Sequence, residues 1–170
     1  LAARYAKEIS LEKGQLVAEL ASNDGCILKP FRAHCRVLGV EPAKNIAEVA
    51  NKDGVPTVAE FFGHELGQKL REEHGPAELI MARNVLAHVP DLVGFVKGVR
   101  AWLSDDGIFH VEAPYLKPMV DHLEFDTIYH EHFSYFSVTA LDRLFKEAGL
   151  VLWDVEEIPL HGGSLIARGK

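Results

Sequence analysis

Short apolar runs alternate with segments of helical periodicity along most of this chain. The apolar runs predict strands, which are bounded by turn-forming residues such as Ser22, Asn23 and Gly25. The predicted strands cover residues 16–20, 37–40, 56–59, 79–82, 108–113, 151–158 and 164–167. The predicted helices cover residues 26–34, 43–52, 66–74, 92–103 and 139–148. Asp91 is placed to cap the fourth helix, whose apolar residues recur at intervals of three and four.

This regular alternation of strands and helices indicates an α/β fold. Five strand-helix units followed by a hairpin-like pair predict an open, doubly wound sheet that is mostly parallel, with helices on both faces. We expect seven strands, the last of them antiparallel. A single domain is expected to span residues 1–170, because this length suffices for one sizeable core.

Ligands of such sheets bind at the carboxyl ends of the strands. The loops expected at that edge are residues 21–25, 41–42, 60–62 and 83–88, together with a long insert, residues 114–137. The insert is longer than most connections in compact domains. We therefore predict that it forms part of the functional site.

The charge balance argues against a nucleic-acid partner. The chain has 18 Lys and Arg against 25 Asp and Glu, and it has no basic stripe. No apolar run approaches the roughly 18 residues needed to cross a bilayer. Cys26 and Cys35 form neither a zinc nor a disulfide pattern, which favours a reduced, cytoplasmic setting. The chain starts without Met in what reads as a helix, so we expect an excised piece of a longer polypeptide.

The first loop is acidic and poor in glycine. A dinucleotide fold needs several glycines close to the pyrophosphate, whereas this loop offers Gly25 alone and no GxGxxG motif. Glu19 and Asp24 would repel a pyrophosphate but would attract an ammonium or sulfonium cation. S-adenosylmethionine carries both cations, so we predict it as the cofactor.

Glu41 ends the second predicted strand, where a carboxylate can accept hydrogen bonds from both ribose hydroxyls. Enzymes that use NAD and enzymes that use S-adenosylmethionine share this contact, and a helix macrodipole would also stabilise a carboxylate there. Phe61 and Phe62 follow the third strand. They could flank the adenine or the sulfonium, or they could belong to the core.

Residues 125–132 crowd four titratable side chains into a segment that is neither a clean helix nor a clean strand. Tyr129, His130, Glu131 and His132 are consecutive there. Proximity and burial can tune such groups toward neutral pH, which predicts proton transfer. The structural alternative is a polar loop with satisfied histidines.

Five segments, in order along almost the whole chain, carry a family resemblance. They are residues 19–25 (ELASNDG), 39–43 (GVEPA), 84–89 (NVLAHV), 125–137 (FDTIYHEHFSYFS) and 161–164 (HGGS). Together they resemble the class I S-adenosylmethionine-dependent methyltransferases of the sugar C-methyltransferase group, and the Tyr-His-Glu-His block is the most specific of them. Members methylate carbon 3 of nucleotide-linked 4-keto deoxysugars. The resemblance therefore implies a Rossmann-like methyltransferase fold, this reaction and a nucleotide-sugar substrate.

The resemblance also implies site residues. It implies cofactor contacts from the first loop and Glu41, and a catalytic base at His132, helped by Glu131 and Tyr129. The full set of expected cofactor contacts is Glu19, Ala21, Ser22, Asn23, Gly25, Glu41, Pro42, Phe61 and Asn84. Members usually have a cysteine-rich zinc-binding segment before this core and a further domain after it. Neither occurs in these 170 residues, so we predict no metal, and we expect other domains of the polypeptide to complete the sugar site.

A ketone becomes a carbon nucleophile when the proton on its neighbouring carbon is removed to give an enolate. An imidazole has a suitable pKa without tuning, and His132 is the expected base. Glu131 could orient the imidazole, and the Tyr129 hydroxyl could donate to the developing oxyanion. In an extended segment His130 and His132 point to opposite sides, so the choice between them stays open. We interpret His88 as a helix-entry histidine.

Other functions remain open at this point. One is a methyltransferase with a different small-molecule acceptor, because Arg83 beside Asn84 departs from the family pattern. Another is an NAD-dependent oxidoreductase, which the acidic first loop opposes, and a third is a noncatalytic binding module. A metal enzyme that uses residues 130–132 is disfavoured, because metal-ligand pairs on one helix face sit at i and i+4.

Overall fold

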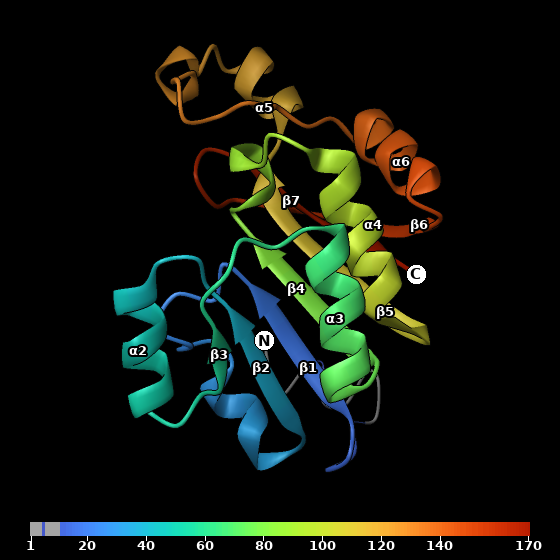
Figure 1. Ribbon diagram of the computed structural model, residues 1–170. Helices are drawn as coiled ribbons and strands as arrows, with labels where there is room; N and C mark the ends of the chain where they lie inside the picture. The colour runs from blue at the N-terminus through green and yellow to red at the C-terminus, as the bar shows by residue number, and fades with distance from the viewer. Residues whose placement is uncertain (1–4, 6–10) are drawn as a thin grey trace.

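The computed structural model describes Tyr5 and residues 11–170, and its elements follow the predicted alternation (Figure 1). The strands are β1 (Leu16–Leu20), β2 (Arg36–Val40), β3 (Thr57–Val58), β4 (Ala77–Arg83), β5 (Leu103–Pro114), β6 (Leu152–Ile158) and β7 (Ser164–Gly169). The α-helices are α2 (Lys44–Lys52), α3 (His64–His74), α4 (Leu92–Trp102), α5 (Leu116–Asp121) and α6 (Val138–Glu147). The 3-10 helices are η1 (Lys29–Ala33), η2 (Leu86–His88) and η3 (Phe125–Thr127).

The strands form one 7-stranded sheet in the order β3-β2-β1-β4-β5-β7-β6. All neighbouring pairs are parallel except those of β7, which is antiparallel to both β5 and β6. The predicted doubly wound sheet with an antiparallel last strand is therefore confirmed. Because β1 lies between β2 and β4, the direction of winding reverses there. The loops after β1 and β4 diverge at such a point and leave a crevice for a ligand.

Apolar side chains on opposite faces of the sheet form two core clusters. Along β1, Val17 belongs to one cluster and Ala18 to the other, as the twofold period of a strand requires. The larger cluster includes the fully buried Trp102 of α4 and lies where α3 and α4 cover the sheet (Figure 1). The indole N–H of Trp102 donates to the carbonyl of Gly75 at 3.2 Å, so this large side chain is buried without an unsatisfied donor.

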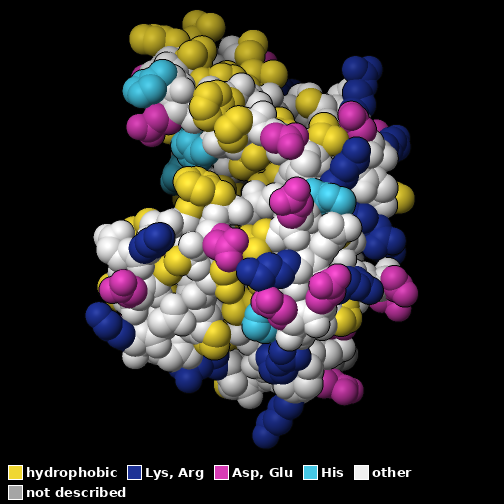
Figure 2. Space-filling model, in the orientation of Figure 1, with side chains coloured by type: hydrophobic (Ala, Val, Ile, Leu, Met, Phe, Trp, Pro, Cys, Tyr) yellow, Lys and Arg dark blue, Asp and Glu magenta, His cyan; other side chains and the backbone are white. Residues whose placement is uncertain are grey.

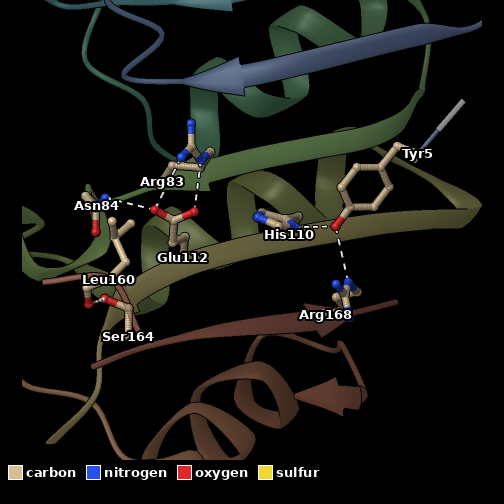
Figure 3. A network of polar contacts seen from close by, with 8 residues as sticks. All are labelled: Tyr5, Arg83, Asn84, His110, Glu112, Leu160, Ser164 and Arg168. Atoms are coloured by element: carbon tan, nitrogen blue, oxygen red, sulfur yellow. Dashed lines mark hydrogen bonds and ion pairs between the residues drawn. The ribbon is translucent and has the colours of Figure 1, made fainter. Parts of the chain in front are cut away.

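Tyr5 is almost completely buried in the smaller cluster, and its hydroxyl reaches a polar pair on the sheet. The hydroxyl accepts from Nε of Arg168 at 3.2 Å and shares a hydrogen bond with Nδ1 of His110 (Figure 3). Arg168 also pairs with Asp154 and Glu156 of β6. These contacts provide partners for Nδ1 of His110 on β5 and for the buried guanidinium of Arg168 on β7.

The predicted helix over residues 26–34 is wrong. The segment forms only η1, preceded by turns in which Leu28 and Lys29 donate to the carbonyl of Gly25. Pro30 has no backbone N–H to donate to the carbonyl of Cys26, and it disfavours helical geometry at Lys29. An α-helix therefore cannot become established there.

Other boundaries differ by a few residues. β5 begins at Leu103, but its register with β4 shifts between Ala77 and Leu79, so regular pairing resumes at Ile108, where the sequence predicts the strand. α6 begins at Val138, one residue earlier than predicted, and is capped by Ser137, whose hydroxyl accepts from the backbone of Ala140. The predicted Asp91 cap is confirmed, since its carboxylate accepts from the backbone of Gly94 at 2.9 Å.

The long insert between β5 and α6 is closed at its base and contains α5 and η3. Tyr115 and Phe136 form an isolated parallel bridge, and the backbone of Leu116 donates to the carbonyl of Phe136 at 2.8 Å. In Figure 1 the insert lies beyond the arrowhead of β4, at the carboxyl edge of the sheet. Within the described residues, no helix combines the length and apolar character that crossing a bilayer demands.

Candidate functional site

The first loop has an unusual backbone that brings it close to β2. Ala21 and Asn23 have φ values of 53° and 52°, in the left-handed region, and Gly25 follows at 74°. Such conformations are costly for residues other than glycine and tend to occur at functional sites. The backbone of Ser22 donates to the carbonyl of Val40 at 3.2 Å, which fixes the loop over the crevice beside β1.

Glu41 ties this loop to the end of β2. Its carboxylate accepts from the backbone of Asn23 at 3.0 Å and from the backbone of Ala43 at 2.9 Å. Ala43 is the N-cap residue of α2, so the carboxylate also lies where the helix macrodipole favours negative charge. Each oxygen has a further acceptor position, because a carboxylate can accept about four hydrogen bonds.

A largely apolar cavity of about 560 Å³ opens between these loops and the end of β4. Its lining includes Ala21, Val40, Pro42, Phe61, Val85 and His88. Phe61 lies at the rim with 86% of its surface exposed, whereas Phe62 packs edge-on against Phe95 with 5.2 Å between ring centroids. Two aromatic residues were predicted to contact the cofactor. The Phe61 ring is free to cover a ligand, whereas the Phe62 ring also packs in the core.

Glu19 lies on β1, two residues before the cavity lining begins at Ala21. It is only 4% exposed, and its Oε2 has no hydrogen-bond partner. Burial raises the pKa of this carboxyl to about 8, with smaller effects from Arg83, which lowers it, and from Asp24 and Glu112, which raise it. Near neutral pH this carboxyl is therefore mostly protonated.

Glu112, at the carboxyl end of β5, holds the end of β4 in place (Figure 3). It accepts from Nε of Arg83 at 3.1 Å and from the side-chain amide of Asn84 at 3.1 Å. Asn84 has a φ of 52°, and its buried Oδ1 has no partner. The ends of β1 and β4 therefore each present one buried oxygen that lacks a donor.

The insert presents His132 to this edge of the sheet. Nε2 of His132 shares a hydrogen bond of 2.9 Å with the Tyr129 hydroxyl, and its ring lies 4.9 Å from that of His88. Burial and the neighbouring His88 lower the pKa of His132. A neutral imidazole at neutral pH is the form that can accept a proton.

Two backbone contacts fix this part of the insert on η2. The carbonyl of Glu131 lies 2.9 Å from Nδ1 of His88, and the backbone of Phe133 donates to the carbonyl of Ala87 at 2.8 Å. Glu131 thus contacts His88 through its backbone, while its side chain and that of His130 are exposed. Of the two imidazoles, His132 is the one that the structure brings beside Tyr129 and His88.

His88 was missed by reasoning from sequence, which assigned it only a role at a helix entry. In the structure it lines the cavity and contacts the insert, so it connects the two halves of the site. Figure 2 shows a hollow between the insert and the α2 side of the molecule, with histidine side chains at its upper edge. One sequence signal could have indicated a functional role for His88, namely its position. Residues 83–88 follow a buried strand and therefore lie at the carboxyl edge of the sheet, where ligands bind.

The turn between β6 and β7 supports the insert from its other side. The backbone of Tyr115 donates to the carbonyl of Gly163 at 3.0 Å. Gly162 and Gly163 have positive φ values of 77° and 141°, and a Cβ on them would lie 2.4 Å from the Glu124 carboxylate and 2.7 Å from Pro118, respectively. Only glycine allows the insert to sit this close to the turn.

The site suits a cofactor that joins an apolar ring to a cationic group. The cavity is large enough and apolar enough for a planar ring system, and Glu41 lies near it. The unpartnered oxygens of Glu19 and Asn84 need a donor, which an ammonium group would provide. No cluster of three or more metal-ligating side chains occurs among Tyr5 and residues 11–170.

Comparisons with known proteins agree with this geometry. The family model described as a methyltransferase domain matches residues 2–155. C-methyltransferase NovU of Streptomyces niveus is 46% identical over 161 residues, which cover 94% of this chain and 38% of that protein. This chain thus spans less than half the length of that relative.

Solved structures share the fold at low sequence identity. A S-adenosylmethionine-dependent methyltransferase from Clostridium acetobutylicum ATCC 824 has a TM-score of 0.75 at 9% identity, covering 99% of this chain and 88% of that one. Magnesium protoporphyrin IX methyltransferase from Synechocystis PCC 6803, solved with bound SAM, has a TM-score of 0.71 at 12% identity, covering 99% and 74%. At these identities the likeness is one of fold.

Proposed function

Because this chain belongs to the methyltransferase domain family, we propose that it binds S-adenosylmethionine and carries out the C-methylation of a nucleotide-linked ketosugar. The observation that carries the proposal is the position of His88. This residue lines the apolar cavity, and its ring is 4.9 Å from that of His132. A cofactor in the cavity and a base on the insert would therefore meet across a short distance, as bond formation between two bound reactants requires.

The cofactor half of the site is formed by the ends of β1, β2 and β4. Glu41 would accept the ribose hydroxyls with its remaining lone pairs, and Phe61, Pro42 and Val85 would enclose the adenine. Glu19 and Asn84 would face the cationic methionine end. When bound, S-adenosylmethionine supplies an electrophilic methyl group.

The acceptor half is formed by the insert. His132 would remove the proton from the carbon next to the ketone, since its lowered pKa keeps the imidazole neutral at pH 7. The Tyr129 hydroxyl, 2.9 Å from Nε2 of His132, would stabilise charge that develops on the ketone oxygen or pass on the proton. His130 is the alternative base, although its side chain is exposed.

The insert also carries apolar side chains that face outward. Leu123, Phe125 and Phe133 are 78%, 79% and 64% exposed, and Figure 2 shows hydrophobic side chains gathered over this part of the molecule. Patches of this kind usually bind another surface. We propose that further domains of a longer polypeptide cover this face and hold the nucleotide.

The decisive experiment is a screen of nucleotide ketosugars with isotope-labelled S-adenosylmethionine, read by mass spectrometry. A labelled methyl group on a sugar carbon is expected, whereas transfer to oxygen or nitrogen would refute C-methylation. A thermal-shift comparison of S-adenosylhomocysteine with NAD tests the cofactor separately. Stabilisation by NAD alone would restore the oxidoreductase alternative.

A further inference from the structure

A buried acid without a partner lies beside the proposed cofactor site. The Glu19 side chain is 4% exposed, and its Oε2 makes no hydrogen bond. A buried carboxylate without donors is strongly disfavoured, so such a group either takes up a proton or pairs with a cation. The described structure offers it no direct ion pair.

The charged groups around Glu19 explain why it stays unpaired. The nearby cation is Arg83 on β4, but Arg83 is already engaged by Glu112 of β5, with its Nε and a terminal nitrogen 3.1 and 3.4 Å from the two carboxylate oxygens. The other charged neighbours, Asp24 of the first loop and Glu112 itself, are acidic. The surroundings of Glu19 thus hold more negative than positive charge.

We infer that Glu19 is protonated in the empty domain and loses this proton to solvent when the cationic end of S-adenosylmethionine enters. The O–H bond of the carboxyl breaks, and the carboxylate formed pairs with the cofactor's cation. This inference rests on the proposed cofactor. It adds that cofactor binding releases a proton and that Glu19 is the source of that proton.

Electrostatics supports the direction of this exchange. Burial raises the pKa of Glu19 to about 8, so at pH 7 most molecules carry the proton before binding. A cation held next to the carboxylate lowers the pKa again. Affinity should therefore rise by up to about tenfold per pH unit as the pH increases toward 8.

Titration calorimetry of the chain in buffers of different ionisation enthalpy measures the protons released per cofactor bound. We expect net proton release at pH 7 for the wild-type chain, and a smaller release as the pH approaches 8. Glu19→Gln imitates the protonated acid in shape and charge, so it should fold, abolish most of the release and bind with little pH dependence. Glu48→Gln, at an exposed carboxylate of α2, is the matched control and should keep the release.

Infrared difference spectra give a second and direct measurement. They should show a carboxylic acid C=O band that disappears on cofactor binding and is missing in Glu19→Gln.

The two cofactor forms identify the cation that pairs with Glu19. Proton release on binding S-adenosylhomocysteine, which has only the ammonium, identifies the ammonium as the partner, and proton release on binding S-adenosylmethionine alone identifies the sulfonium. Tight binding without proton release, or equal release in Glu19→Gln, overturns the inference but leaves the proposed function intact. Absence of binding at every pH overturns both.

Discussion

The Tyr129 hydroxyl and Nε2 of His132 lie 2.9 Å apart on the insert, three residues apart in sequence. In the tautomer that carries its proton on Nδ1, Nε2 accepts from the hydroxyl and is the basic nitrogen. In the other tautomer, Nε2 donates to the hydroxyl. Either arrangement couples the imidazole to a group that can relay a proton. The first prediction follows from this pair.

Replacing His132 with Asn should lower the rate of methyl transfer by about 10²- to 10⁴-fold, the usual loss on removing a general base. Cofactor affinity should not change, because His132 belongs to the acceptor half. His130→Asn is the matched control, since that side chain is exposed and should tolerate the change. A larger loss in His130→Asn than in His132→Asn would identify His130 as the base.

The pH profile of kcat/KM should have its acidic limb below pH 6.5. Burial and His88 lower the pKa of His132, so the base stays neutral, and therefore active, to lower pH than an ordinary histidine. In His88→Asn the limb should move to higher pH, because a neighbour that lowers the pKa of His132 is removed. An NMR titration of His132 gives the same pKa without turnover. A limb that stays in place in His88→Asn would show that the two rings are not coupled.

Glu41→Ala should weaken cofactor binding at least tenfold. Hydrogen bonds to a charged acceptor contribute about 1.5 to 3 kcal/mol each, and this carboxylate also holds the backbone of Asn23 and Ala43. Glu41→Gln keeps the shape and one acceptor, so its loss should be smaller. Calorimetry at fixed pH measures both variants. Unchanged affinity in Glu41→Ala would exclude Glu41 from the ribose contact.

The stability of the empty domain should fall as pH rises from about 4.5 to 8, in part because of Glu19. Its folded-state pKa of about 8 lies above the ordinary value of 4.5, so the folded chain binds more protons than the unfolded chain in this window. The contribution of Glu19 to the free energy of unfolding should fall by at most about 1.4 kcal/mol per pH unit in this window. Denaturant unfolding of wild type and Glu19→Gln at several pH values isolates it. Parallel stability curves would show that Glu19 ionises normally.

Gly163→Ala should displace the insert without harming the cofactor half. The φ of 141° is unfavourable for alanine, and the added Cβ would lie 2.7 Å from Pro118, so a loss of more than about 1 kcal/mol is expected. Limited proteolysis should cut the insert faster, methyl transfer should slow, and cofactor affinity should persist. Gly14→Ala is the control, because a Cβ there meets nothing within 4 Å. An equally protected insert in Gly163→Ala would contradict a supporting role for the turn.

The sequence by itself determined the fold class and the edge at which the site lies. Buried strands appear as apolar runs, and the cap at Asp91 is a local signal, because it depends on neighbouring residues only. The helix expected over residues 26–34 failed for a local reason as well, since one proline sufficed to break its hydrogen-bond ladder.

Only the tertiary structure decided which residues meet at that edge. His88 and Glu131 are 43 residues apart, Arg83 and Glu112 are 29 apart, and the chain has no local pattern that pairs them. The buried state of Glu19 is likewise a tertiary property. A carboxyl's pKa depends on the removal of water and on charges from other strands, and these come together only when the chain has folded.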